Sequence, residues 1–239
     1  MSLPAVPSLP QKTGTQHWHS LPGSARGLLL ALAAQSRTQL TVLLTDNSRS
    51  ALLLQDELRF YAPDLPVVLF PDWEILPYDL FSPHQDIISQ RIAALYQLPQ
   101  MQHGVLIVPV STALQRLAPK DFLIGGSLML DAGQTLDIEA MRDQLQAAGY
   151  HCVDTVYEHG EFAVRGSLLD LYPMGSELPY RIDLFDNEIE TLRTFDPESQ
   201  RSIDQVGSIR LLPAREFPFD KQSRTDFRNR FRERFDTDF

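Results

Sequence analysis

The sequence predicts a two-domain α/β protein, in which a parallel sheet flanked by helices precedes a smaller α+β domain with a mainly antiparallel sheet. Three observations support this fold class. Short apolar runs alternate with segments of helical spacing up to about residue 120. Glycines cluster within 121–134, and after residue 150 the strand-like runs are short and bounded by turn residues. The 239 residues are enough for two domains of ordinary size.

The first domain is expected to span 21–126, after a loosely ordered lead-in at 1–20 that carries prolines at 4, 7 and 10. Strand and helix patterns alternate along it, which indicates a parallel sheet covered by helices. In chain order the expected elements are a helix at 28–35, a strand at 41–45, a helix at 50–61, a strand at 67–70, a helix at 86–98 and a strand at 105–108.

The second domain is expected to span 127–210 and to begin, after a glycine-rich break, with a helix at 138–148 that Gly149 ends. Within 161–190, two alternating segments flank a turn-rich loop, which predicts a small antiparallel sheet. Alternation directs one set of apolar side chains inward and leaves a partly polar outward set, namely Ala163, Arg165, Arg181, Asp183 and Phe185.

That outward set has the composition of a contact patch, because Arg and Phe are enriched at the cores of protein interfaces. A second interpretation stays open from the pattern alone. In it, Arg181 and Asp183 form a solvated ion pair of little energetic value, and a neighbouring loop caps Phe185.

Several segments resemble a known family. FAVRGSLLDLYP (162–173) and RIDLFDNEIE (181–190) are similar to domain 2 of the excision-repair protein UvrB, and more closely to the matching domain of the transcription-repair coupling factor family, Mfd. Segments at 70–95, 105–117 and 193–202 extend the resemblance from about residue 20 to the end of the chain.

The resemblance implies that 127–210 is the surface that docks the UvrA protein, through the motif positions Arg165, Arg181 and Phe185. Each guanidinium offers a planar fork of donors that suits a carboxylate on the partner. Phe185 would supply apolar area between the two arginines. In the intact protein, the chain's own carboxy-terminal part is expected to be able to cover this surface and restrain the motor.

The resemblance also implies a degenerate helicase-like (RecA-like) fold for 21–126, matching UvrB domain 1a, and a truncated start of domain 1b at 211–239. The latter contains Phe227, Phe231 and Phe235 at intervals of four, which predicts one apolar stripe on an arginine-rich, solvated helix. The family's ATP- and magnesium-dependent DNA motor and its RNA polymerase-binding domain are expected beyond residue 239.

The loop before the first predicted helix is a degenerate nucleotide-binding loop. A working P-loop needs G-x-x-x-x-G-K-[ST], in which amides cradle phosphate, Lys neutralises it and the hydroxyl binds magnesium. Here Arg26 stands in place of the Lys and Gly27 in place of the hydroxyl, after Gly23 and Ser24. The nearest acidic pair, at 56–57, lies inside a predicted helix. The loop therefore predicts no phosphoryl transfer and no cofactor for this chain, with a residual anion site left open.

Direct contact with DNA is the alternative function. Trp73, Tyr78 and Phe81 could stack on bases, but three acidic residues lie among them, so we expect them to pack onto the sheet. A formal charge of −10 also disfavours binding to a phosphate backbone. No nucleophile elbow or metal-ligand cluster is evident.

Composition also bears on the compartment. Cys152 is the only cysteine, so no intramolecular disulfide can form; a packing role and a reducing cytoplasm are expected. No run approaches about 18 apolar residues, which predicts no membrane span. The sequence therefore favours a non-catalytic recruitment module, with a nucleotide-dependent enzyme or a damaged-DNA binder as the alternative.

Overall fold

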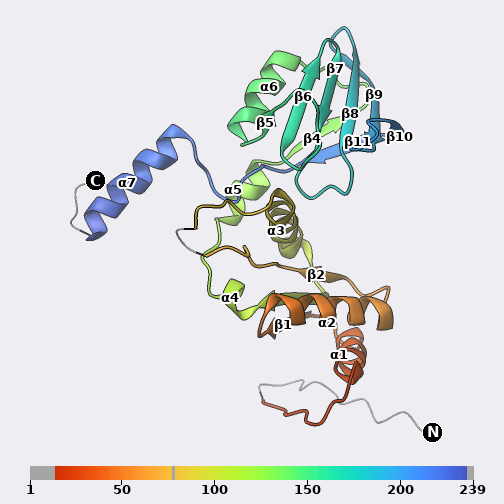
Figure 1. The fold of residues 1–239 in the computed structure, drawn as a ribbon, viewed down its shortest axis with the longest axis vertical. Coiled ribbons are helices and arrows are strands. Elements are labelled where there is room, and N and C mark those ends of the chain that lie inside the picture. The colour runs from red at the N-terminus through yellow and green to blue at the C-terminus, as the bar shows by residue number, and fades with distance from the viewer. Residues whose placement is uncertain (1–13, 77–78, 236–239) are drawn as a thin grey trace. The chain divides into compact units, whose positions relative to one another are not determined.

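The computed structural model describes residues 14–76 and 79–235, which form two compact units (Figure 1). The first unit contains the described residues up to Ser82 together with Gln97–Arg116. The second contains Pro83–Tyr96 and the described residues from Leu117 onward. Parallel strands build the sheet of the first unit and mainly antiparallel strands those of the second, so the predicted mixed α/β class is confirmed.

The first unit is built on a three-stranded parallel sheet in the order β1-β3-β2. Its elements are α1 (Ala25–Gln35), β1 (Leu40–Thr45), α2 (Ser48–Tyr61), β2 (Val67–Leu69), η1 (Leu98–Gln100), β3 (Gly104–Pro109) and α4 (Val110–Ala113). The central strand β3 is buried along its whole length, which accounts for its continuous apolar run. Asn47 begins α2, because its side chain accepts a hydrogen bond of 2.8 Å from the Ser50 amide.

Helices α1 and α2 pack on one face of this sheet. Their contact residues form a core with alternate residues of the strands, including Ala31, Ala34, Ala51, Leu54, Leu58, Val105 and Ile107. On the opposite face Val42 is 53% exposed and Leu44 64% exposed. In the described part of the chain the helices α1 and α2 therefore lie on the same side of β1.

The second unit contains a six-stranded sheet in the order β10-β9-β8-β7-β6-β5 and a two-stranded sheet, β11-β4 (Figure 1). All neighbouring strands are antiparallel except β5 and β6. The elements are α3 (Gln85–Gln97), α5 (Lys120–Gly125), β4 (Leu128–Asp131), α6 (Ile138–Ala147), β5 (His151–Cys152), β6 (Glu161–Arg165), β7 (Leu168–Leu171), β8 (Tyr180–Phe185), β9 (Glu188–Phe195), β10 (Ser202–Val206), β11 (Ser208–Leu211) and α7 (Lys221–Phe235).

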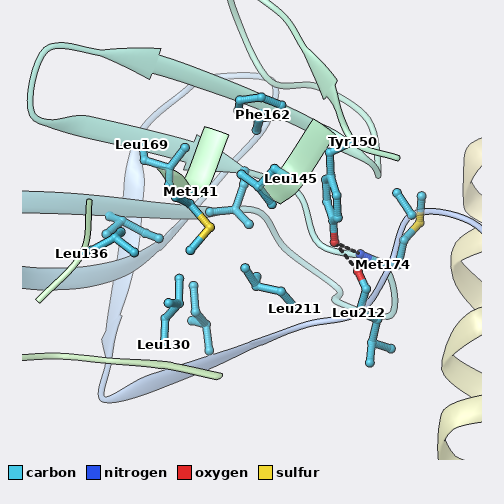
Figure 2. Packing of buried hydrophobic residues seen from close by; sticks show 14 of the residues in the cluster. Leu130, Leu136, Met141, Leu145, Tyr150, Phe162, Leu169, Met174, Leu211 and Leu212 are labelled. Atoms are coloured by element: carbon cyan, nitrogen blue, oxygen red, sulfur yellow. Dashed lines mark hydrogen bonds between the residues drawn. The ribbon is translucent and has the colours of Figure 1, made fainter. Parts of the chain in front are cut away.

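The main core of this unit lies on one face of the six-stranded sheet and is closed by α6, α3 and the β11-β4 pair. Figure 2 shows Met141 and Leu145 of α6 among strand residues such as Phe162 and Leu169. Tyr150 is buried there, and its hydroxyl donates a 2.6 Å hydrogen bond to the Leu212 carbonyl. Burial raises the pKa of Tyr150 well above its ordinary value.

A β-bulge in β9 adjusts this core. Ile182 pairs with Leu192, whereas Leu184 pairs with Ile189. A separation of two positions in β8 therefore corresponds to three positions in β9, which has one extra residue. The extra residue keeps both Ile189 and Leu192 fully buried while β8 holds its strict alternation. Ile182 and Leu184 consequently point inward, as the sequence predicts.

The structure corrects several expectations about the elements. The glycine-rich stretch 121–134, expected to be an irregular link between the domains, contains β4 and most of α5. The loop expected inside 161–190 contains strand β7. Helix α3, expected as part of the first domain, belongs to the second unit, since Ile88, Ile92 and Leu95 join the main core of that unit. The apolar stripe of α3 fits either partner, so periodicity alone could not assign it.

Two side chains expected to pack are exposed. Cys152 lies exposed on the edge strand β5. Phe81 is 77% exposed, so packing onto the sheet is wrong for this ring, while Tyr78 lies outside the described residues. The predicted phenylalanine stripe of α7 does form, with ring centroids 5.9 Å apart for Phe227 and Phe231 and 4.6 Å apart for Phe231 and Phe235.

Candidate functional site

The three residues expected to contact a partner lie on one face of the six-stranded sheet, opposite its main core. Arg165 ends β6, while Arg181 and Phe185 lie at two outward positions of β8. Strand β7 runs between β6 and β8, and on the same face it contributes Asp170. We call the four residues Arg165, Asp170, Arg181 and Phe185 the arginine face.

Asp170 joins the two arginines. Its side chain is fully buried, and in the strand register it pairs with Arg181. Arg181 donates two hydrogen bonds to it, Nε to Oδ1 at 2.7 Å and Nη2 to Oδ2 at 2.9 Å. Arg165 donates from Nη2 to the same Oδ2 atom. One buried carboxylate thus binds two guanidinium groups, an arrangement in which its desolvation is offset by charge-assisted bonds.

Arg181 has further partners that fix its orientation. Its Nη1 donates a 3.2 Å hydrogen bond to the Gln200 carbonyl, and its guanidinium carbon lies 4.8 Å from the centre of the Phe195 ring. The hydrogen bonds to Asp170 raise the pKa of Arg181 further above its ordinary value. Only 19% of the Arg181 side chain is exposed, compared with 46% of that of Arg165.

The open interpretation of these residues is wrong on both points. Arg181 pairs with Asp170, and the ion pairs of the described residues include none between Arg181 and Asp183. Phe185 is not capped, because 70% of its surface is exposed. The face is also less polar than expected at one end, where Val156, Ala163, Tyr172 and Phe195 form a small second core.

Asp170 is the functional candidate that the sequence reasoning missed. It belongs to the motif FAVRGSLLDLYP, yet the stretch containing it was expected to be a loop, so no partner could be assigned to it. The sequence does contain a signal for a strand at this position. In LLDL, Asp170 is flanked by two leucines that both proved buried, so a strand there must carry a carboxylate on the face that also bears Arg165.

In the loop predicted to be a degenerate nucleotide-binding loop, Ser24 and Gly27 contact side chains of α2. Ser24 Oγ lies 2.7 Å from the hydroxyl of Tyr61 on α2. A Cβ added at Gly27 would lie 2.3 Å from Glu57 Oε2, so this carboxylate packs directly against the first turn of α1. The Glu57 carboxylate therefore lies beside the position where a P-loop carries its magnesium-binding hydroxyl, and its charge opposes phosphate there.

This close packing makes a prediction about stability. Replacing Gly27 with Ala should destabilise the first unit by about 1–3 kcal/mol through overpacking, although Ala is the better helix former. The Cβ would also lie 2.5 Å from Glu57 Cβ, so α1 and α2 would have to separate. Urea unfolding would measure the change. Gly125→Ala is the matched control, because a Cβ there meets nothing within 4 Å. Equal stability of the two variants would contradict the packing.

Neither a metal site nor a membrane helix emerges from the described residues. Within 14–76 and 79–235, no group of three or more His, Cys, Asp or Glu side chains could hold a metal ion. No helix in the same part of the chain is long and apolar enough to cross a membrane. The arginine face presents charged donors and one exposed aromatic ring.

The arginine face lies in a segment that is similar to a known protein family. Residues 128–217 match the family described as the UvrB interaction domain, and this range contains all four residues of the arginine face. The matched range lies within the second unit of this chain.

Comparison with individual proteins then relates the rest of the chain to a larger family. The chain is 52% identical over 230 residues to the transcription-repair-coupling factor of Escherichia coli K12, which covers 96% of this chain and 20% of that protein. The corresponding protein of Haemophilus influenzae is 49% identical over 215 residues, and that of Bacillus subtilis 30% identical over 196 residues. The chain is thus similar to transcription-repair-coupling factors and spans about a fifth of the length of these relatives.

Proposed function

We propose that this chain is the UvrA-recruiting module of a transcription-repair coupling factor, and that it performs no catalysis itself. In this role it docks the nucleotide excision repair machinery at a stalled RNA polymerase. The observation that carries the proposal is the match of residues 128–217 to the UvrB interaction domain, together with the exposed Phe185 and the half-exposed Arg165 inside that range. The homologous coupling factors support the assignment to transcription-coupled repair.

The UvrA protein is the proposed partner of the arginine face. Phe185 provides an exposed aromatic ring at one end of β8, and Arg165 provides a half-exposed guanidinium at the end of β6. An aromatic anchor beside an Arg is the typical composition of an energetic hot spot. Contacts with RNA polymerase and DNA, and the use of ATP and magnesium by a motor, are assigned to parts of the longer protein outside this chain.

The competing function, a nucleotide-dependent helicase-like enzyme, is opposed by the first unit. Its loop at Gly23–Gly27 lacks the Lys and hydroxyl of a P-loop, and Glu57 packs a carboxylate against Gly27. We therefore propose that this unit is a helicase-like domain without nucleotide chemistry, needs no cofactor and acts in the cytoplasm. Direct reading of damaged DNA is disfavoured by the charge of −10.

The full-length protein could use the same face for self-control. In this part of the proposal its carboxy-terminal region covers the arginine face until UvrA displaces it, which couples docking to the motor. ATPase rates of the full-length protein with and without Arg181→Ala test this idea, and unchanged rates would count against it.

Calorimetric titration of purified UvrA into this chain tests the proposed function. Wild type is expected to bind, and a triple variant with Arg165→Ala, Arg181→Ala and Phe185→Ala is expected to lose binding. Circular dichroism must show that the triple variant keeps its fold, because Arg181 also holds the buried Asp170. Binding of UvrA by the folded triple variant at wild-type affinity would overturn the assignment of the face.

A further inference from the structure

We infer that Asp170 is a positioning residue of the UvrA-docking face, that Arg181 is held inside the face by it, and that Arg165 is the guanidinium that binds a carboxylate of the partner. The inference rests on the proposed function. It assigns different roles to Arg165 and Arg181, for which the sequence predicts the same role. The two arginines differ in the number of donors that are already hydrogen-bonded.

Arg181 has little capacity left for a partner. Its Nε and Nη2 bind Asp170, its Nη1 binds the Gln200 carbonyl, and Phe195 covers one side of its guanidinium plane. The side chain is only 19% exposed. A guanidinium so placed acts as a fixed part of the sheet surface, since moving it would leave a buried carboxylate without its bidentate partner.

Arg165 is placed differently. It shares only Nη2 with Asp170, and within the described part of the chain its Nε and Nη1 donors have no hydrogen-bond partner. Its side chain is 46% exposed at the end of β6. The bond to Asp170 limits the rotamers of this long side chain before docking, which lowers the ordering cost that binding would otherwise include.

The open donors of Arg165 indicate the chemistry of the partner. Arg165 and Arg181 share the carboxylate of Asp170, and Asp183 adds a second carboxylate at an outward position of β8, so the free N–H groups of Arg165, and not a net charge of the face, favour an acceptor on the partner. The half-exposed guanidinium of Arg165 ends β6 and the exposed ring of Phe185 ends β8, with β7 between the two strands. The group that fits is a carboxylate of UvrA next to an apolar contact, bound by the open donors of Arg165.

Lysine replacements at Arg165 and Arg181 test the two roles without removing positive charge. Lys keeps the positive charge and loses the planar fork. In biolayer interferometry with purified UvrA, Arg165→Lys is expected to weaken binding about tenfold or more, and Arg181→Lys by no more than about threefold. Arg142→Lys, at an exposed position of α6 on the other side of the sheet, is the control and should bind as wild type. An equal or larger loss at Arg181 than at Arg165 would overturn the inference.

The positioning role of Asp170 needs a readout that simple loss of stability does not change. Asp170→Asn should raise the dissociation rate about tenfold while the association rate is retained, because the face becomes more positive and Arg165 less ordered. In an Arg165→Ala background the same replacement should have little further effect, since Asp170 acts through Arg165. Losses that add across the two sites, or a wild-type dissociation rate in Asp170→Asn, would refute the role.

These outcomes distinguish the two levels of the proposal. If wild type itself does not bind UvrA, the proposed function fails, and this inference fails with it. If wild type binds and the lysine variants give the reverse order, the docking function stands and only the division of roles is wrong. If Asp170→Asn does not fold, the comparison of Arg165→Lys with Arg181→Lys still decides the division of roles.

Discussion

A chain with Arg91 replaced by Ala is expected to lose about 3–5 kcal/mol of unfolding free energy in the second unit, because a buried carboxylate would be left without its partner. Arg91 on α3 has no exposed surface, and Glu216, in the segment after β11, is 5% exposed. Nε lies 2.5 Å from Oε1 and Nη2 lies 3.3 Å from Oε2, so the pair is bidentate.

The size of this effect comes from desolvation. Burial raises the pKa of Glu216, and the hydrogen bonds from Arg91 oppose that rise. Removing the guanidinium leaves only the unfavourable contribution. The pair also connects two segments that are 125 positions apart in the chain, so its loss would loosen α3 from the core that Ile92 shares with the sheet.

Urea unfolding followed by circular dichroism measures the effect. Fluorescence is unsuitable, because Trp18 and Trp73 both lie in the first unit. A double variant, Arg91→Met with Glu216→Leu, should recover most of the loss, since an apolar pair of similar volume carries no buried charge. Arg142→Ala, at an exposed site of α6, is the control. Surface replacements usually change the unfolding free energy by less than about 1 kcal/mol. If Arg91→Ala and Arg142→Ala differ in unfolding free energy by no more than this amount, the prediction is contradicted.

The same helix shows what the sequence could and could not predict. The spacing of apolar residues in α3 predicts a helix at nearly its observed bounds, because amphipathic periodicity is local. Its partner is not local. Arg91 lies on the buried side of the helix and requires Glu216, which is far along the chain in a segment with no pattern of its own.

The arginine face was predicted in part for a similar reason. Alternation in β8 correctly placed Arg181 and Phe185 outward, since Ile182 and Leu184 are buried between them. The sequence does not predict β7, because Gly166, Pro173 and Gly175 around this short run favour a turn-rich loop. The position of Asp170 between the two arginines depends on the strand order β8-β7-β6, which no local pattern encodes.

Phe185→Ala is expected to weaken the binding of UvrA by about 30-fold or more, the loss of about 2 kcal/mol typical of an interface hot spot. The ring is 70% exposed at the end of β8, opposite Glu188 across the hairpin, so the unbound chain gains little from burying it. An exposed aromatic ring that becomes buried on docking contributes through desolvation of its whole surface. The expected loss is accordingly one of affinity, with the unfolding free energy changed by no more than about 0.5 kcal/mol.

Calorimetry with UvrA and urea unfolding, performed on the same preparations, separate affinity from stability. Met129→Ala is the matched control, because Met129 is another large apolar side chain, 43% exposed, on the separate β11-β4 pair. Phe185→Leu should fall between wild type and Phe185→Ala, since Leu keeps apolar area but not the flat ring. If Phe185→Ala and Met129→Ala bind UvrA equally well, the partner does not bury this ring, and the docking surface must be sought away from the end of β8.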